Sequence, residues 1–241
     1  MTMKTIVRAL IILILYGTGI CSAATIEHSY KSVYIDPFYG GKDTGPPIAK
    51  TYRAKDVTLR IAKLLQQELE TRGAKTSLSR NKDVFLTTEQ RTVIAKANAA
   101  DVYVGIRVSY QDRDSITLYH LKSQPTKAKT TGDRNELDEI FKALAFDDLA
   151  YESGRLASVI SSNLKKTMSD VPVSTTTHYN DDLLFYLVTS SPCPVVVIDF
   201  NVQKSSNEYT YILNSDKINN ITTSIVEAVT EFMKRSVVEI N

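Results

Sequence analysis

The sequence predicts a single α/β domain in which a twisted, mostly parallel or mixed central sheet is flanked by helices. Short apolar runs of the kind that form buried strands, such as residues 33–35 and 194–200, alternate with longer segments whose apolar residues recur at helical spacing. With 241 residues and a hydrophobic content of 43%, the chain has the size of one such domain with a short extension. We expect the domain to span residues 32–238.

The beginning of the chain predicts an export signal and a short linker. Lys4 and Arg8 form a basic region ahead of the apolar residues 9–16, and the small residues just before position 25 suit signal peptidase. Residues 1–24 are therefore expected to be a signal peptide, and residues 25–31 a linker. The mature protein would be exported, either periplasmic or cell-wall associated, with no transmembrane span.

Cys21 offers an alternative, because an acylated cysteine would make the protein a membrane-anchored lipoprotein. Ile20 argues against it, since a lipobox has a small residue before its cysteine. Without Cys21 the chain retains one cysteine, Cys193, which is expected to be a buried apolar residue. A net charge of +2 is too small to indicate a nucleic-acid partner.

The first predicted strand, residues 33–35, leads into a glycine-rich loop. Asp36 and Pro37 end the strand, because proline has no N–H to donate to a sheet. The glycines that follow permit a sharp turn, which would present Phe38 and Tyr39 at the carboxyl end of a central strand. Ligands bind at this edge of open α/β sheets, so Asp36, Phe38 and Tyr39 are candidate site residues.

Residues 36–45 resemble the first motif of the zinc-dependent N-acetylmuramoyl-L-alanine amidases of type 3, which cut the bond between muramic acid and the stem peptide of peptidoglycan. The family motif reads Asp-Pro-Gly-His-Gly-Gly-x-Asp-x-Gly, and its histidine is a zinc ligand. The Asp-Pro, the Gly-Gly, Asp43 and Gly45 match. Tyr39 stands at the histidine position, and Phe38 stands at that of the preceding glycine.

The resemblance continues through the next two predicted elements, an amphipathic helix at residues 55–72 and a strand at residues 74–78. In the family, the equivalent helix begins with a glutamate that is the second zinc ligand. Ala54 stands at that position, and its methyl group cannot coordinate a metal.

Residues 80–109 contain positions that match the family's scaffold and one position that matches a zinc ligand. Arg80, Asp83 and Arg91 match family positions that are expected to orient loops through charge-assisted hydrogen bonds, and a helix is expected around Arg91. The buried strand at residues 101–109 aligns with a family strand whose histidine is the third zinc ligand. Arg107 replaces that histidine, and a guanidinium has no lone pair to offer a metal.

The second half of the chain is expected to contain strands at residues 115–121, 183–188 and 194–200 and helices at residues 137–145, 151–168 and 218–233. The last strand aligns with a family strand that carries the catalytic glutamate, and Asp199 takes this position with a shorter side chain. His120, on a strand, and His178, in a loop that could reach the cleft, are further candidates.

Replacement of the three ligand positions, by Tyr39, Ala54 and Arg107, implies that zinc is lost and that no cofactor remains. The chain is therefore predicted to be a catalytically inactive amidase-like protein. It would act as a peptidoglycan-binding or regulatory module at the cell wall, with peptidoglycan or an envelope protein as its partner.

Two further hypotheses concern the replaced site. Arg107 is expected to supply the charge of the missing metal and to pair with Asp199, or else with Asp36. The alternative to an inactive protein is an active N-acetylmuramoyl-L-alanine amidase, whose site would be rebuilt from His120, His178 and Asp199.

Overall fold

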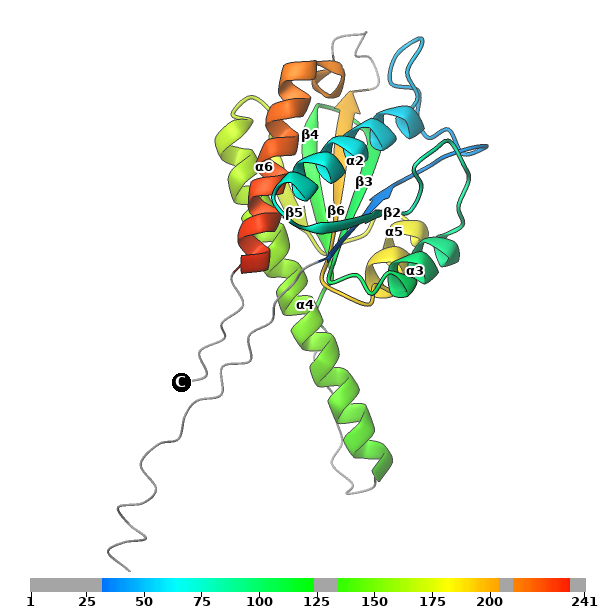
Figure 1. The fold of residues 1–241 in the computed structure, drawn as a ribbon, viewed down its shortest axis with the longest axis vertical. Helices are drawn as coiled ribbons and strands as arrows, with labels where there is room; N and C mark the ends of the chain where they lie inside the picture. Colours follow the sequence, from blue (N-terminus) through cyan, green and yellow to red (C-terminus); the bar gives the residue numbers. More distant parts are fainter. Residues whose placement is uncertain (1–31, 124–133, 204–209, 235–241) are drawn as a thin grey trace, which may run out of the picture. The chain divides into compact units, whose positions relative to one another are not determined.

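A six-stranded mixed sheet forms the centre of the computed structural model, which describes residues 32–123, 134–203 and 210–234 (Figure 1). The strands are β1 (Ser32–Pro37), β2 (Lys75–Leu78), β3 (Val102–Gln111), β4 (Ser115–His120), β5 (Val173–Thr176) and β6 (Val195–Gln203). Their order is β2-β1-β3-β6-β4-β5, and the first four of these are parallel. Strand β4 is antiparallel to β6, and β5 is parallel to β4. The predicted mixed α/β sheet is confirmed.

The chain divides into two units, and every described residue belongs to the unit formed by residues 30–235. The expected signal peptide at residues 1–24, with Cys21, and the linker at residues 25–31 lie outside the described residues. The same holds for the last positions of the predicted domain, residues 235–238.

Helices cover both faces of the sheet. They are α2 (Ala54–Thr71), α3 (Thr88–Ala97), α4 (Arg134–Thr167), α5 (Asp182–Thr189) and α6 (Ser215–Lys234), with a short 3-10 turn η1 (Tyr211–Leu213). Helices α2, α4 and α6 pack over one face, and α3 and α5 lie together over the other (Figure 1). Among the described residues, no helix combines the length and the apolar character needed to cross a membrane.

The two faces of the sheet differ in character toward the carboxyl end of β3. Val104 and Ile106 belong to the apolar core beneath α2, α4 and α6. Successive side chains of a strand point to opposite faces, so Tyr103, Arg107 and Ser109 lie on the face of α3 and α5. That face therefore begins apolar at Tyr103 and becomes polar from Arg107 onward.

The expected strand at residues 183–188 is wrong, because this segment lies in α5. The Asp181 side chain accepts a hydrogen bond from the backbone N–H of Leu184 at 2.8 Å and caps the helix. Leu184, Leu187 and Val188 are buried at helical spacing. A short apolar run does not by itself distinguish a strand from a buried helix, and here the cap decides between them.

Two smaller differences concern the second half of the chain. The helices expected at residues 137–145 and 151–168 are parts of the single helix α4. Strand β5 was not expected, because its four residues are mostly polar and it lies at the edge of the sheet. The remaining expected strands and helices are confirmed to within a few residues.

A buried carboxylate at the end of β1 ties four segments of the chain together. Asp36 accepts hydrogen bonds from the guanidinium of Arg91 and from the hydroxyl groups of Ser79 and Tyr103. These partners come from α3, from the segment after β2 and from β3. Arg91 also donates to the carbonyl oxygen of Tyr39 at 3.0 Å, so the same network holds the loop that follows β1.

A second set of contacts holds this loop against α2. Arg80 donates to the carbonyl oxygens of Phe38 at 3.0 Å and Lys55 at 2.7 Å. The Asp83 carboxylate accepts from the backbone N–H of Gly41 at 2.7 Å and pairs with the Lys55 ammonium at 2.6 Å. The predicted loop-orienting role of these arginine and aspartate side chains is confirmed.

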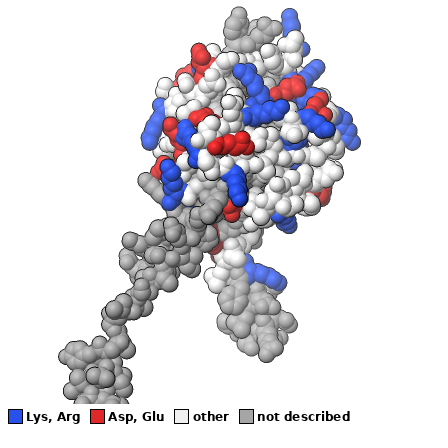
Figure 2. Space-filling model, in the orientation of Figure 1, with Lys and Arg blue, Asp and Glu red and all other residues white. Residues whose placement is uncertain are grey.

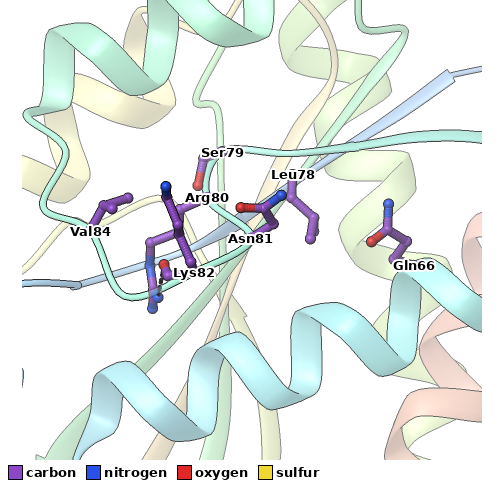
Figure 3. Close-up of a pocket in the computed structure, with 7 residues that line it drawn as sticks. All are labelled: Gln66, Leu78, Ser79, Arg80, Asn81, Lys82 and Val84. Atoms are coloured by element: carbon purple, nitrogen blue, oxygen red, sulfur yellow. Dashed lines mark hydrogen bonds between the residues drawn. The ribbon is translucent and has the colours of Figure 1, made fainter.

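A surface pocket of about 390 Å³ lies between α2 and the segment that follows β2 (Figure 3). Its lining consists of Gln66 from α2 together with Leu78, Ser79, Arg80, Asn81, Lys82 and Val84. The Arg80 guanidinium is engaged by backbone carbonyl oxygens. The pocket therefore does not offer that charge to a ligand.

Charged side chains are interspersed on the visible face of the molecule (Figure 2). Lysine and arginine alternate there with aspartate and glutamate, in keeping with the net charge of +2. On the described part of this face there is no extended basic surface of the kind that binds nucleic-acid phosphates.

Replacing Arg91 by methionine should unfold the protein more easily than replacing an exposed arginine. The side chains of Arg91 and Asp36 are 5% and 0% exposed, so Arg91→Met leaves a buried carboxylate without its counter-charge. We expect a loss of about 3 to 5 kcal/mol in the free energy of unfolding, measured by urea denaturation. Arg72→Met, which breaks a partly exposed pair with Glu68, should cost less than about 1 kcal/mol. Equal losses for the two variants would contradict this role of Asp36.

Candidate functional site at the carboxyl end of the sheet

A strip of polar side chains crosses three strands on the face of α3 and α5. We call it the polar strip, and it consists of Arg107 and Ser109 on β3, Asp199 and Asn201 on β6, and Ser115 and Thr117 on β4. The strand register sets these residues in two rows across the sheet. One row joins Arg107, Asp199 and Thr117, and the next joins Ser109, Asn201 and Ser115.

A chain of hydrogen bonds runs through the second row. The Ser109 hydroxyl lies 2.8 Å from Oδ1 of Asn201 and 2.9 Å from Oδ2 of Asp199. The Asn201 amide donates to the hydroxyl oxygens of Ser115 at 3.1 Å and Thr117 at 2.9 Å. Because a hydroxyl has one proton, Ser109 serves only one of its two acceptors at a time.

Arg107 lies between two carboxylates. Its Nη2 is 2.6 Å from Oδ2 of Asp181, and its Nε is 3.7 Å from Oδ2 of Asp199. The expected pair with Asp199 is therefore present only at the longer distance. Asp36, the second expected partner, pairs with Arg91 instead. Burial lowers the pKa of Arg107, but the carboxylates of Asp199 and Asp181 outweigh it and raise that pKa above its usual range.

Asp181 and Ser109 are site residues that the sequence reasoning missed. A sequence signal for Asp181 exists, because an aspartate one or two residues before an apolar run is a common helix N-cap, and Asp181 and Asp182 precede the run that begins at Leu183. No such signal marks Ser109, whose place beside Asp199 follows only from the pairing of β3 with β6.

Asp199 is fully buried and poorly supplied with hydrogen-bond donors. Its Oδ1 atom has no hydrogen-bond partner among the described residues, and Oδ2 shares the Ser109 hydroxyl with Asn201. Burial raises the pKa of Asp199 to about 6, against the opposing effects of the Arg107 charge and the Ser109 hydrogen bond. A carboxyl group of this kind exchanges a proton near neutral pH.

Tyr39 and Ala54 lie together next to this site. Tyr39 has a φ of 66°, which is uncommon for a bulky residue, and its hydroxyl donates to the Val108 carbonyl oxygen. A Cβ on Gly45 would lie 2.8 Å from the Tyr39 ring and 2.7 Å from the Cβ of Ala54. Gly45, with a φ of 60°, therefore leaves the room in which the ring packs. Burial raises the pKa of Tyr39 to about 12, although the nearby charge of Arg107 lowers it.

The two candidate histidines lie apart from Asp199. His120 is on β4 next to Tyr119, which faces α5, so His120 points to the opposite side of the sheet. Its Nδ1 lies 3.2 Å from the carbonyl oxygen of Leu121, and burial lowers its pKa. His178 is exposed in the segment between β5 and α5.

The other candidates are buried rather than placed on the polar strip. Asp36 is enclosed by its three donors, and Phe38 packs in the core under α3 and α5. Asp36 and Phe38 therefore support the loop that contains Tyr39, and neither side chain contacts the polar strip. Cys193 is buried, as predicted, and burial raises its pKa to about 12.

The residues at the three positions compared with zinc ligands do not suit a metal. They are the phenol of Tyr39, the methyl group of Ala54 and the guanidinium of Arg107, which is held in its ion pair with Asp181. Within the described ranges, no group of three or more histidine, cysteine, aspartate or glutamate side chains is placed to hold a metal ion. A catalytic zinc site takes three such protein ligands.

Known proteins resemble this chain in sequence. The family described as N-acetylmuramoyl-L-alanine amidase matches residues 33–231. The uncharacterized protein YqiI of Bacillus subtilis is 28% identical over 160 residues, which cover 59% of this chain and 77% of YqiI. The N-acetylmuramoyl-L-alanine amidase AmiC of Escherichia coli is 36% identical over 31% of this chain and 18% of AmiC. The probable cell wall amidase LytH of Staphylococcus aureus is 35% identical over 37% of this chain and 31% of LytH.

Solved structures resemble it in fold. The amidase AmiC2 of Nostoc punctiforme has a TM-score of 0.62 at 19% identity, over 85% of this chain and 98% of AmiC2. The CwlD amidase of Clostridioides difficile, solved in complex with the GerS lipoprotein, has a TM-score of 0.60 at 19% identity, over 84% of this chain and 98% of CwlD. At these identities the likeness is one of fold.

Asp199→Asn should change how stability depends on pH. The folded-state pKa of Asp199 is raised to about 6, so between about pH 4 and pH 6 the folded protein binds more protons than the unfolded chain. Its contribution to stability is therefore complete below about pH 4 and is lost as the pH rises through about 6. Relative to Asp199→Asn, the wild type should lose on the order of 3 kcal/mol between pH 4 and pH 7.

Urea denaturation at closely spaced pH values measures this difference. Asp182→Asn, at an exposed position one residue from Asp181, is the matched control. Parallel pH curves for the wild type and Asp199→Asn would show that Asp199 is not the titrating group.

Proposed function

Since the chain belongs to the N-acetylmuramoyl-L-alanine amidase family, we propose that it is a cell-wall protein that has kept the amidase fold and lost the hydrolytic reaction. It acts as a binding or regulatory module, and its partner is peptidoglycan or a protein of the cell envelope. Membership of the family supports an exported or cell-wall-associated location.

The observation that carries this proposal is the ion pair between Arg107 and Asp181. In the family motif that residues 101–109 resemble, a zinc-binding histidine stands where this chain has Arg107, and a guanidinium repels a metal cation and donates hydrogen bonds only. Tyr39 and Ala54 add no ligand beside it. Without a metal, no residue here would lower the pKa of an attacking water to the neutral range.

Protein partners are supported by one fold relative. The CwlD amidase, which resembles this chain in fold, was solved in complex with the GerS lipoprotein. A protein that no longer needs substrate turnover can retain such a surface while its catalytic residues change. Peptidoglycan binding and partner binding are therefore both compatible with the loss of the metal site.

An active amidase with a rebuilt site is the second candidate. One observation favours it, because the raised pKa of Asp199 suits a group that exchanges protons near pH 6. His120 cannot join Asp199 in such a site, since the two side chains lie on opposite faces of the sheet. His178 would have to act with Asp199 alone.

Zinc content and peptidoglycan cleavage test the proposal directly. We expect purified protein to contain far less than one zinc per chain and to release no soluble fragments from purified peptidoglycan, while the insoluble peptidoglycan still sediments it. Zinc content is measured by plasma mass spectrometry, and cleavage by assay of new amino groups, because hydrolysis of the amide bond frees the amino group of the stem peptide and forms no new reducing end. One zinc per chain together with release of free stem peptide would overturn the proposal and favour the active amidase.

The triple variant Tyr39→His, Ala54→Glu and Arg107→His should recover zinc binding. Histidine suits position 39, because it is among the residues that adopt a positive φ more readily. The double variant that retains Arg107 is the matched control and should bind no zinc, since the guanidinium remains at the site. Zinc titration and thermal unfolding of both variants measure the outcome. A folded triple variant that takes up no zinc would mean that more than the three ligands separates this site from an active one.

A further inference from the structure

The Arg107 side chain contacts buried groups on the side that faces the sheet and partly exposed groups on the side that faces solvent. On the inner side lie the buried carboxyl group of Asp199 and the ring of Tyr39. On the outer side lie Asp181, whose side chain is 35% exposed, and the exposed residue Asn180. If Asp181 moved into solvent, the inner contacts would keep the guanidinium in place.

Asp181 can release Arg107 without giving up its role as a helix cap. Its Oδ1 atom accepts the capping hydrogen bond from the Leu184 N–H, and its Oδ2 atom pairs with Arg107. The two contacts use different oxygens. Because the Asp181 carboxylate is partly exposed, water can solvate it when it leaves, and an incoming carboxylate can take over the pairing with the mostly buried Arg107 guanidinium.

Hydrogen-bond donors continue from Arg107 along the polar strip. The hydroxyl oxygens of Ser115 and Thr117 accept from Asn201, and no described residue accepts from these two hydroxyls. Both side chains are half-buried, so their protons remain available to a ligand. Neighbouring strands are about 5 Å apart, and two residues along a strand span about 7 Å. An anionic sugar or short peptide can therefore contact the guanidinium and these hydroxyls together.

We propose that Asp181 occupies the place of a ligand carboxylate, and that Arg107 binds such a ligand by exchanging Asp181 for it. The inference rests on the proposed function and names the ligand class, a carboxylate-bearing fragment of peptidoglycan. Its source is either the lactyl carboxylate of muramic acid that carries no peptide or a carboxylate of the stem peptide. The exchange replaces one carboxylate by another and leaves the charge of the site unchanged.

Titration of nitrogen-15-labelled protein with defined fragments, followed by nuclear magnetic resonance, tests the exchange. The probes are N-acetylmuramic acid, a stem tetrapeptide and N-acetylglucosamine, which lacks the lactyl carboxylate of the first probe. Asp181→Asn keeps a side chain that caps helices well but removes the competing charge. Asp182→Asn removes a charge from the adjacent exposed position and is the control. Arg107→Gln removes the proposed binding group.

At least one carboxylate probe should bind Asp181→Asn about fivefold more tightly than wild type, the factor that corresponds to an ion pair of about 1 kcal/mol. Asp182→Asn should bind like wild type, whereas Arg107→Gln and the N-acetylglucosamine titration should show no binding. The probe that binds identifies the source of the carboxylate. Unchanged affinity in Asp181→Asn, binding retained by Arg107→Gln, or no binding of either carboxylate probe to Asp181→Asn would overturn the exchange.

Sedimentation with whole peptidoglycan separates this inference from the proposed function. If Arg107→Gln and wild type are retained equally, the chain binds peptidoglycan through another surface, and only the exchange at Arg107 fails. If the wild type cleaves the peptidoglycan, the proposed function itself fails. Thermal unfolding of each variant establishes that the compared proteins are folded.

Discussion

The carboxylate buried at the end of β1 is the constraint on which this end of the sheet depends. A buried charge without partners is costly, and Asp36 is compensated by one guanidinium and two hydroxyl groups. Because these donors come from α3, from β3 and from the segment after β2, their hydrogen bonds hold all three against β1. The loop that carries Tyr39 is then fixed by Arg91 and Arg80, whose guanidinium groups donate to its carbonyl oxygens.

A second buried aspartate, Asp199, has fewer hydrogen-bond donors around its carboxylate than Asp36 has. Asp36 has three close donors, whereas Asp199 shares one hydroxyl with Asn201 and lies 3.7 Å from the nearest guanidinium nitrogen. The first carboxylate is therefore part of the scaffold. Burial raises the pKa of the second to about 6, so the Asp199 carboxyl group can exchange a proton near neutral pH.

Under the proposed function, the guanidinium of Arg107 stands in place of the family's metal ion, which would keep the positive charge and change what it binds. Zinc accepts electron pairs and leaves a position open for water, whereas Arg107 donates hydrogen bonds in a fixed plane and recognises carboxylates. Asp181 already provides such a carboxylate from within the chain. The fold of the family is retained, and the proposed loss of zinc would leave a site suited to binding carboxylates, as expected where one fold carries many functions.

The amino-acid sequence alone predicts the α/β class, most of the strands and helices and the family, and its resemblance to the family motifs marks Tyr39, Ala54, Arg107 and Asp199 as positions where the residues differ. These follow from local patterns and motifs, which need no knowledge of which strands are neighbours. The helix at residues 183–188 depended on the folded chain, because a short apolar run fits a buried strand as well as a buried helix, and the packing of α5 against α3 and β6 is a long-range contact.

The tertiary structure also decided the partners of the two arginines. Arg107 pairs most closely with Asp181, and Asp36 pairs with Arg91, although alignment alone favoured Asp199 and Asp36 as partners of Arg107. Which charges meet depends on the register of the strands and on how the connecting segments cross the sheet. That information is distributed over the whole chain, so no single motif contains it.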